Sequence, residues 1–179
     1  MSPAWSTRVP ERIRWVVEQL ELAPSARVLE IGSGPGYALA LVSERLRRGV
    51  VTGIDRSALQ TRRAREHNAA AIASGRVRVE RLALAAAPEA LGERAFHTLF
   101  AINVNAFWTE PAPSLASALR LLRARGRLSL AYEPPSAARV TAWQRALPAL
   151  LAQHGWTVLD VRATDLAKSR ALCITATPG

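Results

Sequence analysis

A strand-like segment that runs into three alternating glycines constrains the fold of this chain most strongly. Residues 27–31 form a short apolar run, glycines follow at positions 32, 34 and 36, and residues 37–47 carry apolar side chains at helical spacing. Glycine adopts positive φ angles at little cost and lets a ligand approach the backbone closely. This strand–turn–helix unit therefore predicts a ligand-binding turn beside the unpaired N–H groups of a helix start.

Alternation of strand-like and helix-like segments continues along most of the chain. After a first helix over 10–22, we expect strands at 27–31, 50–54, 76–82, 96–102 and 126–132 and helices at 37–47, 57–74, 88–91, 111–123 and 136–154. Pro148 should kink or divide the last helix. Two strand-like runs, 156–162 and 170–177, then follow without a helix between them and should be antiparallel. The pattern predicts an α/β fold with a Rossmann-like doubly wound sheet of seven strands, mostly parallel with an antiparallel C-terminal strand, and helices on both faces.

Length and composition indicate one domain over residues 1–179, with the segment and helix of residues 1–24 as a candidate lid. We expect a cytoplasmic protein without a membrane segment, because the sequence contains no long apolar run and no signal-peptide core. Cys173 is the only cysteine and should be a buried strand residue. The net charge of +10 makes nucleic acid a candidate partner. That partner is not favoured, because the arginines are scattered and several lie at predicted helix ends.

The surroundings of the glycine turn narrow the class of ligand. Asp55 ends the next predicted strand 23 positions after Gly32 (55 minus 32), about the separation of a carboxylate that binds ribose hydroxyls. A dinucleotide fingerprint starting at Gly32 would require a third glycine where this chain has Tyr37. The negative charge of Glu30, just before the turn, suits an ammonium or sulfonium ligand better than a pyrophosphate.

These segments together resemble a known enzyme family. Residues 28–36 and 51–57 look like the first two motifs of class I methyltransferases, and residues 121–130 resemble the family's turn into its fifth strand. The likeness covers residues 10–177, and residues 101–108 resemble a branch that acts on small molecules. The resemblance implies that the chain uses S-adenosylmethionine as its methyl donor.

The resemblance also implies roles for individual residues. The glycine turn would lie against the methionine part of the cofactor, Asp55 would bind its ribose, and Arg56 would flank the adenine. The expected cofactor-binding residues are Glu30, Gly32, Ser33, Gly34, Gly36, Asp55, Arg56, Leu82, Ala83 and Asn103. The family often has an acidic residue after its third strand that binds the adenine amino group, but this chain has Leu82 and Ala83 there. We therefore expect modest cofactor affinity.

Methyl transfer needs mainly alignment of donor and acceptor, so a catalytic residue need not be visible in the sequence. If a base is required, the candidates are His97, His154, Glu133 and Tyr132, and Glu133 at the end of the fifth predicted strand is the favoured one. Candidate acceptor-binding residues are Trp5, Asn105, Trp108 and Tyr132. We expect structural roles for His97 and His154 and a solvated side chain for His67. The histidines lack metal-ligand spacing, so no metal site is expected.

The sequence thus favours an S-adenosylmethionine-dependent methyltransferase that acts on a small or medium-sized organic acceptor. One alternative is an RNA methyltransferase, although residues 103–106 lack the Asn-Pro-Pro-aromatic pattern of many amino-methylating nucleic-acid enzymes. Another is an S-adenosylmethionine-binding protein with little catalytic activity. Because no large segment is inserted between the strands, the acceptor site should be open, and a homodimer could complete it.

Overall fold

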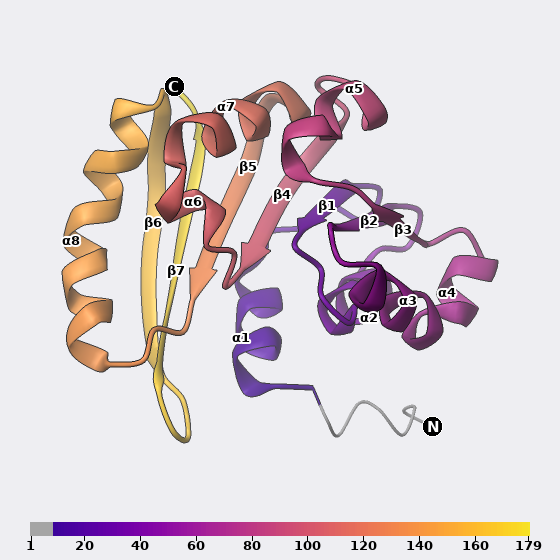
Figure 1. Cartoon of the computed structure of the whole chain (residues 1–179), viewed down its shortest axis with the longest axis horizontal. Helices are drawn as coiled ribbons and strands as arrows, with labels where there is room; N and C mark the ends of the chain where they lie inside the picture. Colours follow the sequence, from indigo (N-terminus) through magenta and orange to yellow (C-terminus); the bar gives the residue numbers. More distant parts are fainter. Residues whose placement is uncertain (1–8) are drawn as a thin grey trace.

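One seven-stranded sheet organises the residues that the computed structural model describes, 9–179 (Figure 1). The strands lie side by side in the order β3-β2-β1-β4-β5-β7-β6. Their bounds are β1 Arg27–Ile31, β2 Val50–Asp55, β3 Val77–Arg81, β4 Phe96–Ile102, β5 Leu122–Tyr132, β6 Trp156–Asp165 and β7 Arg170–Pro178.

The neighbouring pairs among β1 to β5 are parallel, whereas β7 runs antiparallel to both β5 and β6. Helical crossovers separate the first five strands, but only a short loop joins β6 to β7, which forces the reversal of direction. β1 lies inside the sheet between β2 and β4, and Val28 and Leu29 on its two faces are fully buried. The predicted Rossmann-like fold, including its antiparallel C-terminal strand, is confirmed.

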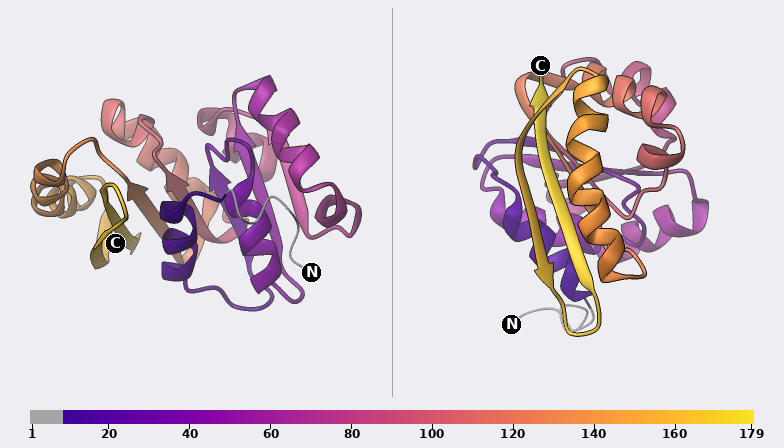
Figure 2. Two further views of the ribbon diagram at one scale, coloured as in Figure 1. Left: turned by 90° about the horizontal axis from the view of Figure 1, so that it is seen from below. Right: turned by 90° about the vertical axis from the view of Figure 1, so that its left-hand side faces the viewer.

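Helices cover both faces of the sheet (Figures 1 and 2). One face is covered by α1 Glu11–Gln19, α2 Tyr37–Arg45, α3 Ala58–His67 and α4 Ala69–Ala73. The other face is covered by η2 Leu84–Ala86, α5 Ala87–Leu91, α6 Ala106–Thr109, α7 Pro111–Leu121 and α8 Ala137–Gln153. On that second face, α8 packs against β6 and β7. Within the described chain, no helix combines the length and apolar character needed to cross a membrane.

Several elements differ from the sequence prediction: η2 and α6 were not expected, and β6 extends to Asp165 instead of ending at 162. The helix expected over 57–74 is two helices separated at Asn68, whose side-chain amide donates to the carbonyl of Gly36. α8 is not divided at Pro148, because burying neighbours such as Leu147 and Leu151, at about 1.5–3 kcal/mol each, offsets a proline cost of about 3 kcal/mol. β5 begins at Leu122, before the expected start, and pairs with β4 across a register shift.

Candidate functional site

The glycine turn lies at the carboxyl ends of the parallel strands, where ligands bind in open α/β sheets. The N–H groups of Gly32 and Ser33 both donate to the carbonyl of Ile54, at 2.8 and 3.0 Å. These two bonds attach the turn to the end of β2. A side chain at position 32 would not fit, because its Cβ would lie 2.6 Å from a methyl carbon of Val104.

Asp55 links the turn to the start of α3. Its Oδ2 accepts from the N–H of Gly34 at 3.0 Å, and its Oδ1 accepts from the N–H of Ser57 at 2.8 Å. Ser57 in turn caps α3 through its own hydroxyl, which accepts from the N–H of Gln60. Each carboxylate oxygen has two lone-pair positions, so each retains one for a further donor.

The other glycines of the turn serve different purposes. Gly34 has a φ of +51°, and a Cβ built on it would meet no described heavy atom within 4 Å. Gly36 has a φ of +79°, and a Cβ there would lie 2.7 Å from Asn68 Nδ2 and 2.9 Å from Ala64 Cβ. Gly36 is therefore required for packing against α3, whereas Gly34 leaves open space above the turn.

Glu30 carries an unusual carboxyl group just before the turn. Its side chain is 3% exposed, and its Oε2 is buried without a hydrogen-bond partner among the described residues. Burial, and secondarily the negative charge of Asp55, hold the pKa of Glu30 well above its usual value. A cationic group placed near this pair would relieve both penalties.

A cavity of about 620 Å³ opens beside the turn, between the ends of β2, β3 and β4 and the start of α7. Of the predicted site residues, its wall contains Gly32, Asp55, Arg56, Leu82, Ala83, Asn103 and Asn105. Glu30, Ser33, Gly34 and Gly36 belong to the adjoining strand and turn and are not among the lining residues. The sequence prediction missed the lining residues Ile54, Val104, Thr109, Glu110 and Ser114, among others, although positions directly after the fourth strand were the place to look.

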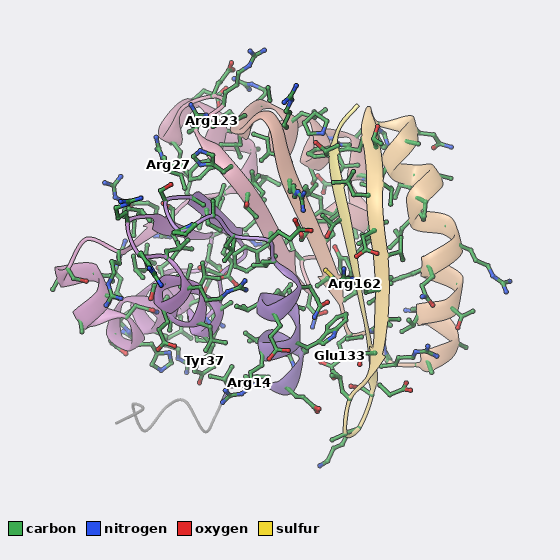
Figure 3. The ribbon with its side chains drawn as sticks, turned by 180° about the vertical axis from the view of Figure 1, so that it is seen from behind. Arg14, Arg27, Tyr37, Arg123, Glu133 and Arg162 are labelled. Atoms are coloured by element: carbon green, nitrogen blue, oxygen red, sulfur yellow. The ribbon has the colours of Figure 1, made fainter. Side chains whose placement is uncertain are left out.

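Asn103 and Glu133 join the ends of β4 and β5. Asn103 has a positive φ of 56°, and its Oδ1 accepts from the backbone N–H of Glu133 at 2.8 Å. The Glu133 carboxylate pairs with Arg12 of α1 at 3.0 Å and accepts from the hydroxyl of Ser169 in the β6–β7 loop. Figure 3 shows Glu133 beside α1 and the β6–β7 hairpin. Its carboxylate thus connects three segments and is not in the cavity wall.

Two of the predicted acceptor-binding aromatics pack against each other. The rings of Trp108 and Tyr132 lie 4.0 Å apart in an edge-on arrangement, and Trp143 of α8 stacks on Trp108 at 4.9 Å. The Tyr132 hydroxyl donates to the carbonyl of Val104, and burial raises the pKa of this phenol. This aromatic cluster contacts the cavity wall through the bond from Tyr132 to Val104, but its three rings do not line the cavity. Trp5 lies outside the described residues.

The remaining candidate side chains are structural except for one surprise. His97 accepts from the N–H of Arg27, and His154 is the C-terminal cap residue of α8. Cys173 is buried in β7, as expected, and burial raises the pKa of its thiol to about 12. We expected a solvated side chain at His67, but it is half-buried, and its ring bonds the Pro35 carbonyl in the glycine turn. In residues 9–179, no group of histidine, cysteine and acidic side chains is arranged to hold a metal ion.

Sequence and structure comparisons agree with this geometry. A family model described as a methyltransferase domain matches residues 29–128, which is more than half of the chain and extends from the glycine turn into the first part of β5. The chain therefore belongs to the methyltransferase family of the class I fold, and its cofactor is S-adenosylmethionine. Comparison with curated proteins gives no match.

Solved structures share the fold at low sequence identity. A SAM-dependent methyltransferase from Aquifex aeolicus is 19% identical with a TM-score of 0.78, over 97% of this chain and 96% of that one. Magnesium protoporphyrin IX methyltransferase from Synechocystis PCC 6803 is 18% identical with a TM-score of 0.68, over 93% and 76%. The cyclase SpnF is 17% identical with a TM-score of 0.74, over 93% and 80%. At these identities the likeness defines the fold and not the acceptor.

The residues around the turn fit this cofactor chemically. The unpartnered Glu30 oxygen and the charge of Asp55 suit a ligand that carries an ammonium and a sulfonium group. Asp55 retains acceptor positions for ribose hydroxyls, and the open space at Gly34 lets a ligand reach the backbone.

Proposed function

We propose that this chain transfers a methyl group from S-adenosylmethionine to a small or medium-sized organic acceptor. In this proposal residues 1–179 act as a single methyltransferase domain, and the cofactor lies along the cavity at the carboxyl ends of the strands. The choice of a small organic acceptor rests on the charge of the cavity wall. Among the described residues that line the cavity, Arg56 is the only basic one, whereas Asp55 and Glu110 are acidic.

The chemistry of the wall supports one orientation of the cofactor. We place the methionine end at the glycine turn, where the negative charge available from the buried Glu30 carboxyl and from Asp55 favours the ammonium group. Asp55 then accepts from the ribose hydroxyls, and the adenine lies between Arg56 and the segment at Leu82 and Ala83. Asn103, which lines the cavity at the end of β4, would hold the cofactor from that side. When bound, S-adenosylmethionine supplies an electrophilic methyl group, and the surrounding side chains need only align the acceptor and exclude water.

An RNA acceptor is the second candidate, and only the net charge of +10 favours it. Nucleic-acid binding draws most of its affinity from lysine and arginine contacts to phosphates. A cavity wall with more acidic than basic groups does not provide such contacts at the reacting centre. A neutral or cationic organic acceptor matches the wall better.

The proposal also includes a candidate catalytic base, Glu133, and a candidate lid over the acceptor site. If the acceptor must lose a proton, Glu133 is our candidate base, and its ion pair with Arg12 would have to open first. The candidate lid lies in residues 1–24. α1 within it is anchored by buried Val16 and Val17 and by Arg45, which donates to the carbonyl of Leu20 at 2.9 Å. We therefore do not propose that α1 itself moves; residues 1–8 of the candidate lid lie outside the described residues. A second copy of the chain remains a candidate for completing the acceptor pocket.

Calorimetric titration with S-adenosylhomocysteine, followed by methyl transfer to a panel of organic acceptors, tests the proposal. Asp55→Asn should weaken binding by about 10- to 100-fold, because hydrogen bonds to a charged group contribute about 1.5–3 kcal/mol. Methylation of RNA, together with steeply salt-dependent RNA binding, would reverse the order of the two acceptors. A folded protein without cofactor binding would refute both.

A further inference from the structure

Residues at the end of α3 bond the last part of the glycine turn, at Pro35 and Gly36. Two consecutive residues, His67 and Asn68, reach back across more than thirty positions to two consecutive carbonyl groups, those of Pro35 and Gly36. The start of α3 is already tied to the turn through Asp55. The same helix thus contacts the turn at both of its ends.

The His67 contact defines the protonation of the ring. Nδ1 lies 2.7 Å from the carbonyl oxygen of Pro35, and a carbonyl can only accept. Nδ1 must therefore carry the hydrogen. The ring also stacks on Tyr37, the first residue of α2, with centroids 5.0 Å apart. Figure 3 labels Tyr37 at the same end of the molecule as Glu133, the end to which the parallel strands point.

The Asn68 contact is equally well defined. Its Nδ2 donates to the carbonyl of Gly36 at 3.0 Å and to that of Ala64 at 2.9 Å, so the two acceptors fix the orientation of the amide. Asn68 is 3% exposed, and its Oδ1 is buried without a partner among the described residues. Leaving this oxygen unbonded costs about 1–3 kcal/mol. An apolar side chain would avoid that cost, so packing alone does not account for asparagine here.

These two bonds fix the peptide orientations that begin α2. Gly36 is the N-terminal cap residue of α2 and is held at a φ of 79° and a ψ of 23°. In a trans peptide the C=O and N–H groups point in opposite directions. Holding the Gly36 carbonyl against α3 therefore turns the N–H of Tyr37 away from α3. Gly36 N–H itself donates to the carbonyl of Ser33, which closes the turn.

We propose that His67 and Asn68 are positioning residues for the cofactor: they clamp the Pro35 and Gly36 carbonyls and so hold the glycine turn in its binding shape. This inference rests on the cofactor site proposed above. The clamp removes conformations that the turn would otherwise lose on binding, so its effect falls on cofactor affinity.

Two substitutions at His67 separate the donor from the ring. His67→Phe keeps an aromatic ring against Tyr37 but removes the Nδ1 donor, whereas His67→Asn removes the ring and keeps a nitrogen donor attached to Cγ. Asn68→Leu replaces the amide by an apolar group of similar shape. His154→Phe, at the end of α8, is the matched histidine control. Affinity for S-adenosylhomocysteine is measured by calorimetry, and the global unfolding of each variant by urea denaturation.

We expect His67→Phe to weaken binding about fivefold and His67→Asn to stay within twofold of wild type, since one hydrogen bond is worth about a factor of five. Asn68→Leu should weaken binding at least as much as His67→Phe, and His154→Phe should not change it. In the wild type, ¹⁵N NMR of the His67 ring should show the Nδ1–H form. Equal losses in His67→Phe and His67→Asn, wild-type affinity in His67→Phe, or an Nε2–H ring would each overturn the proposal. A wild-type chain that fails to bind would instead refute the cofactor site.

Discussion

Gly34→Ala separates the binding role of the glycine turn from its structural role. Gly34 has a φ of +51°, and its missing side chain faces open space. An alanine at such an angle costs roughly 1–2 kcal/mol, and the less flexible unfolded chain returns about 0.4–1 kcal/mol. The free energy of unfolding should therefore fall by only about 1 kcal/mol.

The added methyl group would occupy the space that the cofactor needs at the turn. Overpacking costs about 1–3 kcal/mol, so the affinity for S-adenosylhomocysteine should fall roughly 5- to 150-fold. Gly75→Ala is the matched control, because Gly75 has a φ of +74° and equally open surroundings but lies in the turn between α4 and β3.

Urea denaturation and calorimetry on both variants give the comparison. The two alanines should lower stability by similar amounts, and only Gly34→Ala should weaken binding. Unchanged affinity in Gly34→Ala would refute the argument that the open space above the turn receives the cofactor.

Three further substitutions test other parts of the site. Gly36→Ala should destabilise by about 2–5 kcal/mol in urea denaturation, because its Cβ would lie 2.7 Å from Asn68 Nδ2 at a positive φ; wild-type stability would contradict the packing argument. The raised pKa of Glu30 means that the folded protein binds this proton more tightly than the unfolded chain, so wild-type stability falls as pH rises above about 4.5. Glu30→Gln should therefore be more stable than wild type at pH 8 and not at pH 4, yet bind S-adenosylhomocysteine more weakly; a pH-independent difference would exclude this cause. Tyr132→Phe should lose about 1 kcal/mol of stability with its bond to the Val104 carbonyl and keep wild-type affinity, whereas a large loss of affinity would indicate direct contact with ligand.

Local sequence patterns were sufficient to predict the framework of the fold. The bounds of β1 and β4 agree with the prediction because turn residues or polar segments flank both apolar runs. The spacing from the glycines to Asp55 likewise predicted that this carboxylate would lie at the turn. The strand bounds depend on a few neighbouring residues, and the Asp55 signal depends on a spacing of 23 positions from Gly32 (55 minus 32).

Features that depend on distant residues were not visible in the sequence. The break at Asn68 exists because its amide bonds the Gly36 carbonyl, 32 positions earlier. The Glu133 carboxylate is occupied by Arg12 and Ser169, which only the packing of α1 and the β6–β7 loop brings together. Neither contact can be predicted locally, because the sequence around residue 68 has helical periodicity and Glu133 is visible only as a residue at a strand end.

Mapping of S-adenosylhomocysteine onto the wild-type chain by amide NMR shifts tests the central claim most directly. The account predicts saturable shifts at residues 32–36, 55–57, 82–85 and 103–105, which surround the cavity at the carboxyl ends of the strands. Shifts confined to another face of the sheet, or no shifts in a folded protein, would contradict it.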